Sequence, residues 1–228
     1  MAEIPKHPKK SAGDVAQGLV KAAVSGVPIV GGPAAELVGM VFGPPLEKRR
    51  EKWMDDLATV VEELQDKVEG LTPEKLSQDE AFVTVALRAT EIAIRTHQQE
   101  KLDALRNAVR NTGLRIHLDE TVQQIFLNHV DTLTPWHLRV LKVFQDPHAW
   151  AQAHNINFPN WGAGSPSAVL EVALPDLAGN REFYDQLVSD LKQRGLMTNV
   201  DIHTAMTGHG MFQSRTSRLG NDFLRFIS

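Results

Sequence analysis

Residues 26–52 read Gly-Val-Pro-Ile-Val-Gly-Gly-Pro-Ala-Ala-Glu-Leu-Val-Gly-Met-Val-Phe-Gly-Pro-Pro-Leu-Glu-Lys-Arg-Arg-Glu-Lys. The stretch is apolar, rich in glycine and proline, and then abruptly charged. Two uncharged runs, 22–35 and 37–46, lie on either side of Glu36. A membrane-spanning helix needs roughly 20 apolar residues in a row. Neither run is that long, and Pro28 and Pro33 would interrupt a single helix across both. We therefore predict a Gly/Pro-interrupted apolar hairpin.

The hairpin has two interpretations that the sequence leaves open. It either packs in the core of a helical bundle, or it leaves the bundle and enters a bilayer as a re-entrant element. Membrane or partner contacts would come from Val27, Pro28, Ile29, Val30, Leu37, Val38, Met40, Val41 and Phe42. A basic flank follows, made of Lys48, Arg49, Arg50 and Lys52. Such a flank suits anionic lipid headgroups.

Composition sets outer bounds on the protein class. The chain has 228 residues, is 42% hydrophobic and contains no cysteine. It can build a sizeable core, and disulfides and thiolate chemistry are excluded. The net charge is −4, without the basic surplus that is usual for nucleic-acid binding. We expect a cytoplasmic protein that reaches the membrane only peripherally, on activation.

Hydrophobic periodicity predicts helices through most of the first 133 residues. We expect residues 1–12 to form a flexible basic tail and 13–133 to form a helical bundle that includes the hairpin. One helix face is formed by Leu46, Trp53, Met54, Leu57, Val60, Val61, Leu64 and Val68, and Trp53 is predicted to be buried. A capping box at Ser77 and Glu80 opens a helix that runs to Asn111, with a bend near 97–99.

The helices continue in a second domain, residues 134–228. Asp119 caps the last helix of the bundle, and Thr134-Pro135 begins the next one. Further helices are predicted near 167–174 and 181–194, the second with Phe183, Tyr184, Leu187, Val188 and Leu191 inward. A small β hairpin is predicted from 196–203 and 211–216, and Ser217 caps a final helix. The fold class is therefore mainly α.

The second domain resembles a winged helix. The wing of such a domain is its β hairpin. The sequence pattern that precedes the wing is matched by Leu187, Leu191 and Arg194-Gly195-Leu196, and the pattern that follows it by Leu219-Gly220 and Phe223-Leu224. Joined to a long helical first half, this layout is similar to the abortive-infection alpha group of bacterial proteins. The resemblance implies a non-enzymatic protein of phage defence or cell death, which acts through protein or membrane interaction.

A winged helix often binds DNA through its third helix and its wing. Here the third helix would present acidic and amide groups, including Glu182, Asp185 and Asp190, which repel phosphates. The nucleic-acid or partner contacts that remain are Lys192, Arg194, Arg215 and Arg218. DNA binding by a regulator that dimerises through its helical half is thus the disfavoured alternative. A protein partner or self-association is favoured.

No motif predicts catalysis, a cofactor or a metal. His203, His209 and Asp201 have a spacing that is unspecific for zinc. Ser165, His154 and Asp176 lack the Gly-x-Ser-x-Gly turn of a hydrolase nucleophile. We therefore expect no enzyme activity, no cofactor and no small-molecule substrate.

Overall fold

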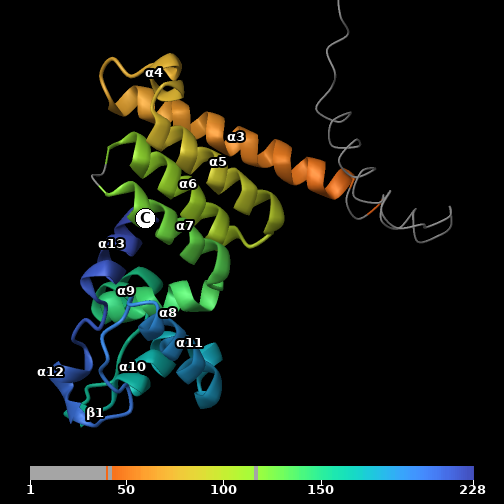
Figure 1. The fold of residues 1–228 in the computed structure, drawn as a ribbon. Coiled ribbons are helices and arrows are strands. Elements are labelled where there is room, and N and C mark those ends of the chain that lie inside the picture. The colour runs from red at the N-terminus through yellow and green to blue at the C-terminus, as the bar shows by residue number, and fades with distance from the viewer. Residues whose placement is uncertain (1–39, 41–42, 116–117) are drawn as a thin grey trace, which may run out of the picture. The chain divides into compact units, whose positions relative to one another are not determined.

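The structure is a computed structural model that describes Met40 and residues 43–115 and 118–228 (Figure 1). The chain divides into two compact units, Met1–Lys52 and Trp53–Ser228. The predicted basic tail, and the hairpin apart from Met40, lie outside the described residues. The predicted domain boundary at residue 134 falls inside the second unit.

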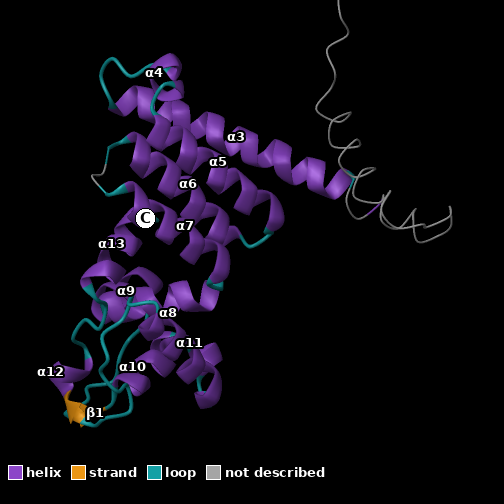
Figure 2. Cartoon of the chain, in the orientation of Figure 1, coloured by secondary structure: helices purple, strands orange, loops and turns teal. Residues whose placement is uncertain are grey.

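Helices dominate the part of the chain that the structure describes (Figure 2). The α-helices are α3 (Pro44–Lys67), α4 (Pro73–Ser77), α5 (Glu80–Arg95), α6 (Gln99–Gly113), α7 (Glu120–Thr132), α8 (Pro135–Gln145), α9 (Pro147–His154), α10 (Pro166–Ala173), α11 (Arg181–Gln193), α12 (Gly208–Met211) and α13 (Arg218–Phe226). A 3₁₀ turn, η1, covers Pro175–Leu177, and the strands are β1 (Ala163–Gly164) and β2 (Met206–Thr207). The predicted class, mainly α with a small β hairpin, is confirmed.

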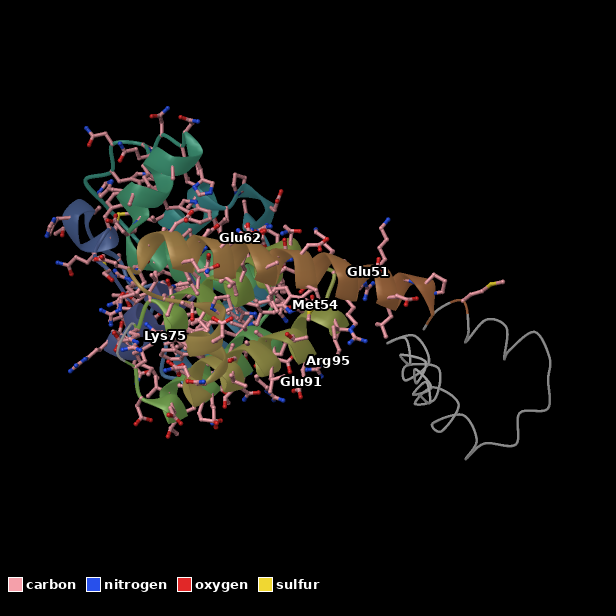
Figure 3. The ribbon with its side chains drawn as sticks, turned by 90° about the horizontal axis from the view of Figure 1, so that it is seen from above. Glu51, Met54, Glu62, Lys75, Glu91 and Arg95 are labelled. Atoms are coloured by element: carbon pink, nitrogen blue, oxygen red, sulfur yellow. The ribbon has the colours of Figure 1, made fainter. Side chains whose placement is uncertain are left out.

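Helix α3 changes character along its length. From residue 47 to residue 52 every side chain is exposed, and the buried positions begin at Trp53 and continue with Val60 and Leu64. The indole Nε1 of Trp53 donates to Thr90 Oγ1 of α5 at 2.9 Å. Met54 was predicted to lie inward but is 48% exposed, and Figure 3 labels it on α3. It follows Trp53 by one position, about 100° around the helix, and so misses the buried face.

Helices α5 and α6 replace the single helix that was predicted to open at the Ser77–Glu80 capping box and to run to Asn111. The chain leaves the helical conformation at Thr96, whose Oγ1 accepts a hydrogen bond from the backbone N–H of Gln98 at 3.2 Å. The break lies where the bend was predicted, and the two helices lie side by side (Figure 1). The predicted capping box is wrong, because Asp79 caps α5 by accepting from Phe82 N–H, while Ser77 belongs to α4.

The remaining helix starts follow the sequence more closely. Asp119 accepts from Thr121 N–H at the start of α7, and Thr134 with Pro135 begins α8, as predicted. Asp146 caps α9 by accepting from Ala149 N–H. Short polar side chains at these positions satisfy backbone donors that have no partner within the helix.

The small sheet joins segments far apart in sequence. Strands β1 and β2 pair antiparallel, with Ala163 opposite Thr207 and Gly164 opposite Met206. The two predicted hairpin arms meet at one antiparallel bridge between Met197 and Thr216. The segment between the arms forms β2 and the short helix α12, so the predicted arms are only partly correct.

The end of α11 contacts the start of α13 through four residues. We call them the clasp: Gly195, Leu196, Ser217 and Gly220. Gly195 ends α11 with a φ of +71°, which favours glycine. Ser217 Oγ donates to the Gly195 carbonyl and accepts from Gly220 N–H, capping α13. A Cβ at Gly220 would lie 2.0 Å from the Leu196 carbonyl oxygen. The glycines matched by the winged-helix sequence patterns therefore have steric and conformational roles here.

Helix α13 ties α6 and α7 to the later helices. Phe223 and Phe226 pack against Phe126 of α7, with ring centres 5.3 and 5.8 Å away. The buried amide of Asn111 on α6 donates to the carbonyls of Arg225, Phe226 and Ser228. The core thus runs continuously through the second unit.

Truncating Trp53 tests the start of this core. We expect Trp53→Ala to lower the free energy of unfolding by about 3–5 kcal/mol, because it removes a buried indole and its hydrogen bond. Met54→Ala is the matched control, and it should change stability by less than about 0.5 kcal/mol. Urea unfolding followed by circular dichroism measures both. A loss below about 1 kcal/mol for Trp53→Ala would show that this face is not core.

Adding one methyl group tests the clasp. Gly220→Ala should destabilise the protein by about 1–3 kcal/mol, because the new Cβ collides with the Leu196 carbonyl. Gly162→Ala serves as the control, since a Cβ added at Gly162 has nothing within 4 Å of it. Thermal melts of the two variants should separate clearly. Equal melting temperatures would contradict the close approach of α13 to Leu196.

Candidate functional site

A groove lies between the first turn of α8, the helix α11 and the turn that joins α5 to α6. Its volume is about 680 Å³, within the range of ligand pockets. We call it the α8–α11 groove, and its lining is Gln98, Gln99, Glu100, Thr134, Pro135, Trp136, His137, Arg139, Phe183, Gln186, Leu187 and Asp190. All of these residues belong to the second unit. Figure 1 shows α8 and α11 as neighbours, and they are in contact.

Trp136 and Arg139 form one wall of the groove. The guanidinium carbon of Arg139 lies 4.8 Å from the centre of the Trp136 ring, a cation–π distance. Arg139 Nε also donates to Glu100 Oε1 at 2.9 Å, which links α8 to the first turn of α6. Trp136 is half-buried and therefore both supports α8 and lines the groove.

His137 forms the floor of the groove and is 6% exposed. Its Nδ1 accepts from the backbone N–H of Thr134 at 3.1 Å, so the ring proton sits on Nε2. Nε2 faces Asp190 Oδ2 of α11 at 3.3 Å. Burial lowers the pKa of His137, and the hydrogen bond to Asp190 only partly opposes this. A neutral imidazole thus joins the start of α8 to α11.

His129 of α7 is a second buried histidine, facing Arg194. Its Nδ1 lies 3.3 Å from Arg194 Nη1, and because an arginine only donates, this nitrogen is the acceptor. The other ring nitrogen, Nε2, is buried without a hydrogen bond in the described structure, and the ring meets Phe223 edge-on. Burial, and secondly the Arg194 charge, lower the pKa of His129 to about 4.

Phe183 stands at the rim of the groove on α11. It is 39% exposed, so its predicted inward position is wrong, whereas Tyr184, Leu187 and Leu191 are buried as predicted. Positions 184, 187 and 191 repeat at three- and four-residue steps and define the buried stripe. Phe183 lies beside that stripe, so its ring remains partly in water.

The predicted basic contacts differ in their exposure to solvent. Arg215 is 4% exposed, which corrects its prediction as a surface contact. Its guanidinium donates to the carbonyls of Gly210 and Gln213, and burial lowers its pKa. Arg194 faces His129, Lys192 is half-buried, and Arg218 is exposed. Holding the turn before α13 is therefore the visible role of Arg215.

The predicted hairpin and its basic flank are described only in part. Met40 is 61% exposed, and the other hairpin residues lie outside the described ranges. Lys48, Arg49, Arg50 and Lys52 occupy the exposed start of α3. Among the residues that are described, none of the helices is both long enough and apolar enough to cross a bilayer.

Four of the six residues weighed for zinc and for hydrolysis, His203, Asp201, His154 and Ser165, have other partners. His203 Nε2 lies 2.6 Å from Asp185 Oδ1 of α11, and the His203 N–H donates to Asp201. His154 stacks on Trp150 with ring centres 3.8 Å apart, while Ser165 pairs with Ser167. Within residues 43–115 and 118–228, no three His, Asp or Glu side chains are grouped so as to hold a metal ion.

Sequence reasoning missed His137 and His129 as structural groups. A signal existed for His137, because a polar residue three positions after the Thr134 cap can return a hydrogen bond to the cap backbone. For His129 the sequence held no signal, because its partners Arg194 and Phe223 are 65 and 94 positions away. The groove itself depends on helices that only the tertiary fold brings together.

Acidification should lower the free energy of unfolding, because His129 resists protonation in the folded protein. Its pKa is about 4 in the folded protein against an ordinary value of 6.5, so its stabilising contribution is complete above pH 6.5 and disappears as the pH falls toward 4. We expect the free energy of unfolding to fall by about 2 kcal/mol between pH 7 and 4.5 from this group. His129→Gln should flatten that pH slope, and the exposed-site control His97→Gln should not. Urea unfolding at several pH values tests this, and an unchanged slope in His129→Gln would contradict it.

Comparisons with known proteins identify no relative of this chain. A scan against protein-family models, a search of curated proteins and a search of solved structures each find no match for this chain.

Proposed function

We propose that this chain is a non-enzymatic protein of bacterial defence or cell death, and that it acts by contacting another protein through the α8–α11 groove. The later helices would serve as a winged-helix-like contact module. A second contact, with a membrane, would come from the apolar stretch that precedes α3 and from the basic flank at its start.

The order of elements supports the winged-helix-like interpretation. Helix α8 is followed by α9, β1, α10, η1 and α11, and then by two segments that meet at the Met197–Thr216 bridge before α13. Thr198 N–H donates to the Arg215 carbonyl, and Ser217 N–H donates to the Leu196 carbonyl, on either side of the Met197–Thr216 bridge. The sequence patterns that carried the resemblance include the clasp residues Gly195, Leu196 and Gly220. Gly195 has a positive φ, and Gly220 leaves no room for a Cβ.

The character of α11 is the observation that carries the choice of a protein partner. This helix presents exposed Phe183 and Glu182 together with Gln186, while Asp185 and Asp190 accept from histidines. Carboxylates on a recognition helix repel DNA phosphates. A partly exposed aromatic ring beside a groove is instead typical of an anchor in a protein interface.

The groove has the composition of such an interface. Trp136, Pro135 and Phe183 supply apolar surface, and Arg139 is held against the Trp136 ring by Glu100. Aromatic residues and arginine are the types most enriched where binding energy concentrates. Because hydrogen bonds already fix His137 and Arg139, a partner would meet a preorganised surface.

The exposed start of α3 supports the membrane part of the proposal. Lys48, Arg49 and Arg50 are all exposed there, directly after an apolar stretch. Each basic residue near an anionic surface contributes roughly 1 kcal/mol. This contact would thus depend on the apolar stretch and the flank together.

A phage-challenge assay tests the proposal. A bacterial host that expresses the chain should show reduced plaque formation or growth arrest, because that is the expected output of a defence protein. Phe183→Asp should abolish this output by placing a charge at the groove rim, and Val41→Asp should abolish any membrane-dependent part. Ile125→Asp is the matched control, since Ile125 is an exposed apolar side chain on α7, outside the groove.

The outcomes separate the proposal from its alternatives. An inert wild type against a broad phage panel would contradict the defence role, and equal loss in Ile125→Asp would contradict the groove. Fluorescence anisotropy with duplex DNA tests the DNA-binding alternative. If the protein-contact proposal is correct, the Kd should be no tighter than about 10⁻⁴ to 10⁻⁶ M at physiological salt. Nanomolar binding would favour a DNA-binding regulator instead.

A further inference from the structure

An aromatic hollow lies away from the α8–α11 groove, between α9, the loop after it and α12. Its volume is about 630 Å³. We infer that this hollow binds a neutral nucleobase or nucleoside, by stacking on its aromatic wall and by hydrogen bonds to amide side chains at its rim. The inference is independent of the proposed protein contact, because the two sites share no lining residue.

The wall consists of rings that come from three segments. Phe212, which follows α12, is nearly parallel to Trp161 at 23°, with ring centres 6.2 Å apart. Phe158 meets Phe212 edge-on at 5.0 Å, and His148 of α9 stacks on Phe212 at 4.4 Å. Trp161, Phe158 and Phe212 are each only partly buried, so aromatic surface remains open to the hollow.

Backbone geometry fixes the position of this wall. Gly208 N–H donates to the Gly162 carbonyl at 2.9 Å, beside the β1–β2 pair. A Cβ at Gly208 would lie 2.3 Å from the Trp161 carbonyl oxygen, so only glycine permits this approach. Helix α12 and β1 are in contact and appear together in Figure 1. The positions of the rings are therefore fixed by the hydrogen bonds between two chain segments, β1 with the loop before it and β2 with α12.

The rim carries hydrogen-bonding groups that the protein does not use. Gln152, Asn157, Asn160 and His209 are all exposed and line the hollow. Among the described residues, their side chains make no hydrogen bond or ion pair. Amide side chains pair with the donor and acceptor edges of bases, and bases stack on Trp and Phe rings.

The lining has no permanently charged side chain, and this narrows the ligand class. None of the twelve lining residues is a lysine, arginine, aspartate or glutamate. Phosphate recognition relies on such cations or on a helix start, and α12 is only four residues long. A base or nucleoside fits this chemistry, and adding a phosphate should bring no gain.

Ligand-observed NMR and calorimetry on the full chain test the inference. Adenosine, guanosine, cytidine and uridine are the probes, each beside its 5′-monophosphate, and at least one nucleoside should bind with a Kd of about 0.1 mM. Its monophosphate should bind no more tightly. A single-stranded oligonucleotide that binds more tightly than the nucleoside would identify the base as part of a strand, which also supports the site.

Variants locate the binding. Trp161→Ala should weaken nucleoside binding about tenfold or more, in line with the loss of one stacking contact. Asn160→Ala keeps the aromatic wall and changes an exposed side chain, so it should fold normally and alter the preference among bases. Leu87→Ala is the control, because it removes an exposed apolar side chain of α5 that lines neither the hollow nor the α8–α11 groove. The inference would be overturned if no nucleoside bound with a Kd below about 10 mM, if a neutral disaccharide bound more tightly, or if Leu87→Ala lost as much binding as Trp161→Ala.

Discussion

The carbonyl groups at the end of α13 must find donors, and α6 supplies them. Asn111 Nδ2 lies 2.9–3.1 Å from three of these oxygens, and Asn107 Nδ2 donates to the Ile227 carbonyl at 3.0 Å. Buried backbone acceptors without partners cost about 1–3 kcal/mol each. The amide of Asn111 therefore makes the docking of α13 specific in a way that the apolar contacts of Phe223 and Phe226 do not.

The position of the α8–α11 groove follows from this docking. Helix α13 contacts α6, α7 and α8, so fixing it also fixes α8 relative to the turn before α6. Near the start of α6, Lys101 is 8% exposed, and its Nζ donates to the Asp131 carbonyl of α7 at 2.7 Å. Buried polar groups of this kind specify one arrangement more than they add stability. The groove is thus built where hydrogen bonds, rather than apolar area alone, decide how helices meet.

Local signals in the sequence predicted most helix starts. Asp119, Thr134 with Pro135, and Ser217 each act within three residues, so their caps depend on little else. The failure at Ser77 is also local, because the Ser77 hydroxyl donates to the Glu74 carbonyl within α4, and Asp79 caps α5 two residues later by accepting from Phe82 N–H. Burial at helix edges was less predictable. Met54 and Phe183 are apolar and adjacent to a buried stripe, and only the packing of neighbouring helices decides that they remain exposed.

The features that could not be predicted from the sequence depend on contacts between residues far apart in the chain. Strand β2 pairs with β1, 44 positions earlier by the Ala163–Thr207 register, and no periodicity marks such short strands. The basic residues show the same limit, because four cations near the wing are candidate DNA contacts when read along the chain. In the fold, Arg215 is held by backbone carbonyls and Arg194 by His129. Charge that holds the fold together is largely withdrawn from the surface, so the positive potential available to a phosphate backbone is smaller than the composition of the segment indicates. Glu182 and Phe183 of α11 remain exposed, and they therefore set the character of this face.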